Sequence, residues 1–143
     1  MDKHSIALSV AFTGIAAKLL QGGRTFNSRF KYPLKADDSA TCFVSRQSGL
    51  AKLIRKSKII VWDEAPMSHK CLLEALDRLL RDLMEENTPF GNKIIVLSGD
   101  FRQLFIVIQG EACSQIINAS FKKSILWKHF KTLKLTENMR IKQ

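Results

Sequence analysis

The sequence predicts an α/β fold in which a parallel sheet lies between two layers of helices. Short apolar runs that favour strands alternate along the chain with segments whose apolar residues recur at helical spacing. Strands that alternate with helices pair in parallel through right-handed crossovers, and helices cover such sheets. With 143 residues, 45% of them hydrophobic and 25% charged, the chain has the length and composition of a single compact domain.

The N-terminal part predicts a strand that leads into a helix. Ser5 to Phe12 is an apolar run that favours a strand, and it ends at Thr13-Gly14. The spacing of Ile15 to Leu20 predicts that a helix starts there. A threonine and a glycine therefore stand at the carboxyl end of the first strand.

A basic segment with interleaved aromatic residues follows at Arg24 to Lys35. Cations attract phosphates and aromatic rings stack on bases, so this composition suits a single strand of nucleic acid. Within the segment, Arg29 and Phe30 are candidate DNA-binding residues. A short basic helix is then expected over Gly49 to Lys56.

Two further apolar runs predict strands. Lys58 to Trp62 has the pattern of a strand that is buried on both faces, and Lys93 to Ser98 is a second fully apolar strand. Between them, leucines and alanines from Met67 to Glu86 recur at three- and four-residue spacing, which predicts a helix with one apolar face. The turn between this helix and the second strand is expected at Asn87 to Asn92. A further strand is predicted at Thr132 to Leu135.

Polar residues follow each predicted strand, at the edge where open parallel sheets bind their ligands. They are Thr13-Gly14, Asp63-Glu64, Gly99-Asp100 and the segment from Thr136 to Arg140. An acidic pair directly after a buried strand suits a nucleotide triphosphatase, because one carboxylate can hold hydrated Mg²⁺ and the next can activate water. An alternative is that Asp63 and Glu64 cap the helix that follows Pro66.

The charge of the chain favours a polyanionic partner. There are 23 Lys and Arg against 13 Asp and Glu, which gives a net charge of +10. The three cysteines are far apart and form no CxxC pair, so we expect neither a disulfide framework nor a zinc site. No apolar run approaches the roughly 20 residues that cross a bilayer, so we expect no membrane insertion.

Four motifs in one order carry a family resemblance: TGIAA at Thr13 to Ala17, WDEAPM at Trp62 to Met67, GDFRQL at Gly99 to Leu104 and LTENMR at Leu135 to Arg140. Together they resemble the Pif family (petite integration frequency) of superfamily-one DNA helicases, especially its transposon-associated branch. The resemblance extends from about Ser5 to the end of the chain. It implies a RecA-like fold of the P-loop NTPase class, with residues 1–143 as an incomplete first motor domain.

The resemblance also implies ATP and Mg²⁺ as cofactors and 5′-to-3′ stepping along DNA. Asp63 would hold the magnesium through water, and Asp100 would lie with the nucleotide. Glu64 would activate water, Gln103 would sense the γ-phosphate and Arg140 would stabilise charge. Thr13 and Gly14 would contact the DNA backbone.

One motif of that family is not found in these residues. No GxxxxGK[ST] occurs between Met1 and Gln143, so the loop that cradles the phosphates is expected upstream of this sequence. The second motor domain is likewise expected outside it. On its own the chain should therefore be inactive and poorly soluble.

Two hypotheses about function remain. The first is an ATP-dependent DNA helicase with roles in DNA repair, recombination or telomere maintenance, acting as a monomer on single strands and duplex/single-strand junctions. It would be located in the nucleus or, alternatively, the mitochondrion. The second is a degenerate transposon-derived fragment that only binds nucleic acid.

Overall fold

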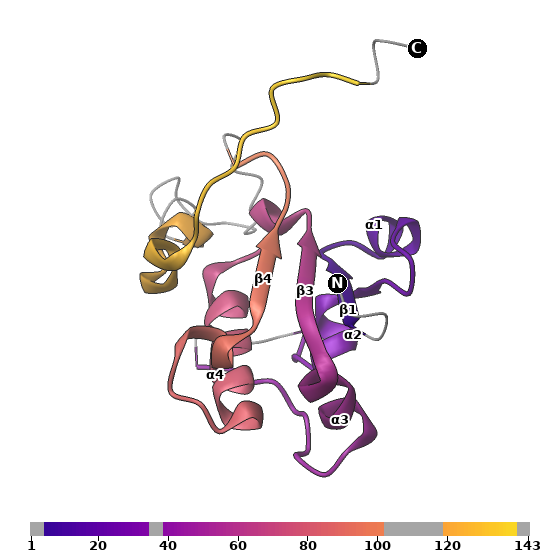
Figure 1. The fold of residues 1–143 in the computed structure, drawn as a ribbon, viewed down its shortest axis with the longest axis vertical. Helices are drawn as coiled ribbons and strands as arrows, with labels where there is room; N and C mark the ends of the chain where they lie inside the picture. Colours follow the sequence, from indigo (N-terminus) through magenta and orange to yellow (C-terminus); the bar gives the residue numbers. More distant parts are fainter. Residues whose placement is uncertain (1–4, 35–38, 102–118, 140–143) are drawn as a thin grey trace.

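A computed structural model describes residues 5–34, 39–101 and 119–139. Its centre is a sheet of four parallel strands in the order β2-β1-β3-β4. The strands are β1 (Ile6–Ala11), β2 (Arg24–Thr25), β3 (Ser57–Asp63) and β4 (Ile94–Leu97). The predicted α/β fold with a parallel sheet is confirmed (Figure 1).

The helices are α1 (Gly14–Leu19), α2 (Phe26–Phe30), α3 (Gly49–Lys56) and α4 (Lys70–Met84), with short 3₁₀ helices η1 (Ala65–Met67), η2 (Pro89–Asn92), η3 (Phe121–Lys123) and η4 (Ile125–His129). The three predicted helices, from Ile15, over Gly49 to Lys56 and over Met67 to Glu86, are present close to their predicted positions, whereas α2 and the short 3₁₀ helices were not predicted. Helix α4 begins at Lys70 because His69 Nδ1 accepts a hydrogen bond from Cys71 N at 3.2 Å. It ends where Glu85 adopts a left-handed conformation with φ of 55°.

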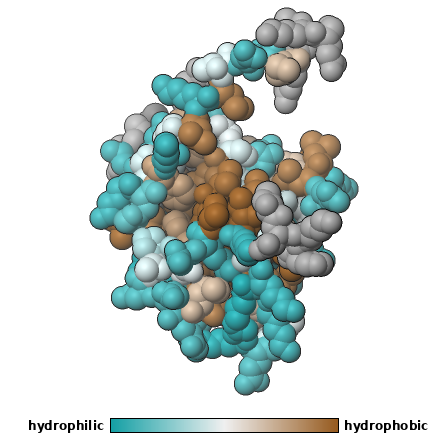
Figure 2. Space-filling view, viewed as in Figure 1, coloured by the Kyte–Doolittle hydropathy of each residue, from teal (hydrophilic) through white to brown (hydrophobic). Residues whose placement is uncertain are grey.

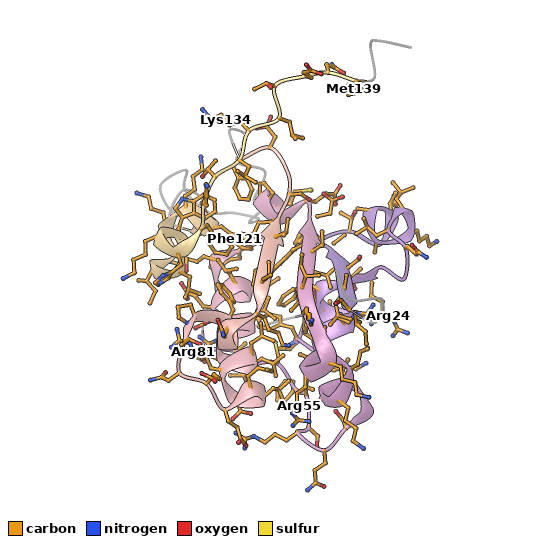
Figure 3. All side chains as sticks on the ribbon, in the orientation of Figure 1. Arg24, Arg55, Arg81, Phe121, Lys134 and Met139 are labelled. Atoms are coloured by element: carbon orange, nitrogen blue, oxygen red, sulfur yellow. The ribbon has the colours of Figure 1, made fainter. Side chains whose placement is uncertain are left out.

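The hydrophobic core lies on one face of the sheet, between the strands and helices α2, α3 and α4. Alternate residues of a strand point to the same face, and on the core face Leu8 and Val10 of β1 and Ile60 and Trp62 of β3 are fully or almost fully buried. Trp62 is the centre of an aromatic cluster: its ring stacks on Phe26 at 4.3 Å and meets the edge of Phe121 at 5.2 Å. Figure 3 shows Phe121 directed toward the sheet from the C-terminal part of the chain.

The opposite face of the sheet is covered by helix α1 at its β1 end, where Ala11 packs against Ala16 and Ala17. On β4, Ile94 is 61% exposed and Val96 is 41% exposed. Figure 2 shows apolar side chains gathered at the centre of this face. The expectation that the strand at Lys58 to Trp62 is buried on both faces is confirmed for the core face alone: Ile60 and Trp62 are fully buried, whereas Ile59 and Val61 on the other face are partly exposed.

The prediction of a strand at Thr132 to Leu135 is wrong. This segment has no regular secondary structure, and it runs away from the body of the molecule (Figure 1). Leu133 is 83% exposed. A β-favouring sequence forms a strand when a neighbour supplies hydrogen bonds, and within the described residues no strand lies beside it. None of the described helices has the length and apolar character that a bilayer crossing requires.

Candidate active site

The carboxyl ends of β1, β3 and β4 meet at one edge of the sheet. Ala11 of β1 pairs with Asp63 of β3, and Trp62 of β3 pairs with Leu97 of β4. This register places Thr13, the Asp63-Glu64 pair and Ser98 side by side. The sequence predicted that four strand ends converge here, and the structure confirms this for Thr13-Gly14, Asp63-Glu64 and Gly99-Asp100. The fourth, before Thr136, is wrong because Thr132 to Leu135 forms no strand.

Asp63 is held rigidly through one of its carboxylate oxygens. Asp63 Oδ1 accepts hydrogen bonds from Ser98 Oγ at 2.7 Å and from the Glu64 amide at 3.0 Å. Within the described part of the chain, Oδ2 has no hydrogen-bond partner. The carboxylate therefore has a fixed direction and an oxygen to offer to a cation.

This geometry fits a hydrated magnesium ion. Mg²⁺ keeps several of its waters and commonly takes one or two protein carboxylates, with phosphate oxygens completing its shell. Among the described residues there is no group of three or more His, Cys, Asp or Glu side chains that could enclose a metal ion. A single half-buried carboxylate with an open oxygen is consistent with an ion held mainly by water and phosphate.

Glu64 occupies an unusual backbone conformation. Its φ of 54° and ψ of 30° lie in the left-handed region, which a non-glycine residue rarely adopts. Two contacts hold it there: Ala65 N donates to the Ser98 carbonyl at 3.1 Å, and Glu64 Oε2 accepts from Thr13 Oγ1 at 2.9 Å. Strained residues of this kind cluster at functional sites.

The alternative that the acidic pair caps the following helix is not supported. Glu64 precedes η1 and makes no side-chain capping hydrogen bond, and helix α4 is capped by His69 instead. The two carboxylates are directed to Ser98 and Thr13 on neighbouring strand ends.

Thr13 has two roles in the structure. Its Oγ1 accepts a hydrogen bond from Ala16 N at 3.2 Å and so caps α1. The same oxygen donates to Glu64. Gly14 next to it is exposed, and no neighbouring atom lies within 4 Å of the place where its Cβ would be.

The loop after β4 packs onto the loop after β3. Gly99 has a φ of +139°, and a Cβ at this position would lie 2.5 Å from Pro66 Cδ. Asp100 follows it in an exposed position at the end of the strand. The expected roles of Gln103 and Arg140 cannot be placed, since both residues lie outside the described ranges.

Arg29 and Phe30 do not form an exposed nucleic-acid surface, so this prediction is wrong. Phe30 is 0% exposed and packs against Phe26, with ring centroids 5.0 Å apart. The Arg29 side chain turns inward, where its Nη2 donates to the Gly22 carbonyl at 2.6 Å. Burial, reinforced by the nearby charge of Arg24, lowers the pKa of Arg29. The segment forms a helix, α2, and both residues lie on its inner face.

Two features of the site escaped prediction from the sequence. Ser98 orients Asp63 and also anchors the loop that carries Glu64, yet a serine before Gly99-Asp100 looks like an ordinary strand end. The available signal was a polar residue closing an apolar run next to the acidic pair. Among the described residues of the basic segment, Arg24 and Lys31 are the exposed cations. Figure 3 shows Arg24 directed away from the core.

A parallel α/β sheet that aligns an acidic pair, a serine and a threonine at its carboxyl edge defines the class of RecA-like domains. The chain belongs to the PIF1-like helicase family, whose family model matches residues 1–143. It is 32% identical over 142 residues to the ATP-dependent DNA helicase RRM3 of Saccharomyces cerevisiae, covering 96% of this chain and 19% of that protein. It is 30% identical over 135 residues to the ATP-dependent DNA helicase Pif1 of Bdellovibrio bacteriovorus, covering 92% of this chain and 30% of the relative.

Solved structures agree with this assignment. The Pif1 helicase from Bacteroides in complex with ADP-AlF3 and ssDNA superposes with a TM-score of 0.71 at 26% identity, over 85% of this chain and 29% of that one. The same score and identity hold for Bacteroides Pif1 bound to ssDNA, over 89% and 31% of the two chains. The chain thus spans less than a third of the length of these relatives.

Proposed function

We propose that this chain is part of the first motor domain of an ATP-dependent DNA helicase. The observation that carries the proposal is the alignment of Asp63, Glu64 and Thr13 at one edge of a RecA-like sheet in a member of the PIF1-like helicase family. Relatives with this family name are described as ATP-dependent DNA helicases. Unwinding would proceed 5′ to 3′.

In this proposal Asp63 holds the magnesium ion of MgATP, and Glu64 takes the proton of the attacking water. The bound cation would neutralise charge on the phosphates. Asp63 is suited to its role because Ser98 Oγ and the Glu64 amide fix the direction of its carboxylate. Glu64 is suited to its role because it follows Asp63 at the carboxyl edge of the sheet, where Thr13 Oγ1 donates to its carboxylate. Asp100, Gln103 and Arg140 complete the proposed nucleotide site.

Single-stranded DNA is the proposed track, with Thr13 and Gly14 as contacts to its backbone. Gly14 is exposed and no atom lies within 4 Å of the place of its missing Cβ, which leaves room for a phosphate to approach this turn. Solved Bacteroides relatives contain ssDNA, and one solved pair of Pif1 helicases acts at forked dsDNA. We propose that the protein acts as a monomer on single strands and on duplex/single-strand junctions. Its role would be in DNA repair, recombination or telomere maintenance, in the nucleus or, alternatively, the mitochondrion.

For residues 1–143 alone we propose DNA binding without ATP turnover. These residues contain no GxxxxGK[ST] motif, and loss of the preorganised phosphate contacts that it provides would lower turnover by orders of magnitude. The second candidate function is that of a degenerate transposon-derived fragment that binds nucleic acid and nothing more, and the net charge of +10 is what favours it.

The test measures ATP hydrolysis and oligothymidylate binding by this chain at two salt concentrations, beside Glu64→Gln. We expect binding that weakens as salt rises, because phosphate contacts release counterions, and no turnover. Turnover that Glu64→Gln abolishes would contradict the proposed need for the phosphate loop. Absence of DNA binding would contradict the proposed DNA contact.

A further inference from the structure

The hydroxyl of Thr13 joins two parts of the site that the proposed function keeps separate. Thr13 belongs to the element assigned to DNA, and Glu64 is the residue assigned to water activation. They are 51 positions apart in sequence, yet Thr13 Oγ1 lies 2.9 Å from Glu64 Oε2. The contact crosses from the carboxyl end of β1 to that of β3, which are paired neighbours in the sheet.

A threonine hydroxyl has one proton to donate. Its oxygen already accepts from Ala16 N at 3.2 Å, which fixes the hydroxyl at the start of α1. The hydroxyl can donate its hydrogen bond to Glu64 or to a DNA phosphate, but not to both at once. The carboxylate of Glu64 and a phosphate are both anions, so each also disfavours the other at this position.

From this geometry we infer that Thr13 is a positioning residue that couples DNA binding to Glu64. The inference rests on the proposed function, since it takes the DNA contact of Thr13 and the water-activating role of Glu64 from there. Without DNA, Thr13 holds the Glu64 carboxylate against the end of β1. When DNA binds, a phosphate oxygen accepts the hydrogen bond of the hydroxyl in place of Glu64, and the Glu64 carboxylate is released toward the nucleotide side of the edge.

The surroundings of Glu64 allow its side chain to occupy two positions. Its backbone is fixed by the Ala65 to Ser98 hydrogen bond, so release of the side chain leaves the loop in place. Asp63 has no hydrogen bond to Thr13 and stays oriented by Ser98 Oγ. The structure therefore allows the carboxylate of Glu64 to move while the metal ligand keeps its direction.

The experiment uses this chain labelled with ¹³C at the side-chain carboxyl of glutamate, and it follows the Glu64 resonance, assigned by its loss in Glu64→Gln. Unlabelled oligothymidylate is the probe, and fluorescence anisotropy measures binding in parallel. We expect the Glu64 resonance to shift in proportion to bound DNA. In the Thr13→Val variant the Glu64 resonance should already differ from that of the unaltered chain before DNA is added, and DNA should shift it no further.

Two variants separate coupling from loss of structure. Thr13→Ser keeps the hydroxyl and should restore the response of Glu64 to DNA. Thr25 caps α2 in the same way, because its Oγ1 accepts a hydrogen bond from Ser28 N at 3.4 Å. Thr25→Val removes this cap and should leave the response of Glu64 to DNA unchanged.

Each result decides the question. If anisotropy shows that DNA binds but the Glu64 resonance does not shift, the coupling is contradicted, whereas the proposed binding of DNA is not. The coupling is also contradicted if DNA shifts the Glu64 resonance of the Thr13→Val variant as much as that of the unaltered chain. Absence of binding contradicts the proposed function itself, and the coupling fails with it.

Discussion

Gly99 lies so close to the ring of Pro66 that a Cβ at position 99 would come within 2.5 Å of Pro66 Cδ. This approach holds the loop after β4 against the loop that carries Asp63 and Glu64. Glycine is needed here for a second reason, because its φ of +139° is a conformation that residues with a side chain rarely adopt.

Gly99→Ala should therefore lower the free energy of unfolding by about 1 to 3 kcal/mol, the usual cost of overpacking or of a strained backbone. Urea denaturation measures this change. The matched control is Gly49→Ala at the first residue of α3, where nothing lies within 4 Å of the added Cβ. Equal stability of the two variants would show that the contact with Pro66 does not constrain the loop.

Asp77 should be a structural carboxylate and not a catalytic one. It is buried on α4, where Oδ1 accepts from Phe90 N at 2.6 Å and Oδ2 accepts from Arg81 Nε at 2.9 Å. Asp77→Ala leaves the buried Phe90 amide without a partner, so we expect a loss of about 1 to 3 kcal/mol in unfolding free energy.

Asp77→Asn keeps an acceptor for that amide and should lose less stability than Asp77→Ala. Asp82→Ala removes an exposed ion pair with Arg46 and should change stability little, because water screens such pairs. The same urea denaturation compares all three variants. A larger effect at position 82 than at position 77 would contradict the assignment.

The exposed side chains of β4 should limit the solubility of this chain. Ile94 and Val96 stand on a face that the described helices leave open, and an apolar strand at the edge of a sheet invites association. The Ile94→Lys/Val96→Lys double variant should reduce light scattering. Ile125→Lys, which replaces an exposed isoleucine of η4, should not. Equal light scattering by the unaltered chain and the double variant would contradict this prediction.

Arg24 should contribute to DNA binding, since it is exposed in β2 beside the carboxyl end of β1. Arg24→Gln should weaken binding to oligothymidylate and reduce the slope of log affinity against log salt by about 0.7, the value expected for one phosphate contact on a single strand. Lys56→Gln removes a charge from the opposite end of the sheet, where β3 begins. It should leave the slope unchanged, and equal effects of the two variants would indicate a diffuse basic surface.

The strands and long helices could be predicted because each is encoded by local periodicity. The leucine spacing of α4 and the apolar runs of β3 and β4 are properties of neighbouring residues in the sequence. Convergence of Thr13 and Asp63-Glu64 followed from one rule, that parallel strands have their carboxyl ends at the same edge.

The errors concern properties that depend on tertiary contacts. Whether Phe30 is exposed depends on which face of α2 meets the sheet, and a basic, aromatic composition does not determine that. The partial exposure of Val61 depends on what covers the second face of β3. The hydrogen bond from Thr13 to Glu64 joins side chains 51 positions apart, and no local pattern predicts it.

The central claim is that Asp63 and Glu64 form a hydrolytic site that works once a phosphate-binding loop is supplied. It is tested most directly in a chimera in which these residues replace the matching segment of the Bacteroides Pif1 helicase. We predict DNA-stimulated ATP hydrolysis that Glu64→Gln lowers by orders of magnitude and Thr25→Val leaves intact. A folded chimera that binds ATP and DNA, yet hydrolyses ATP no faster than its Glu64→Gln variant, would contradict the claim.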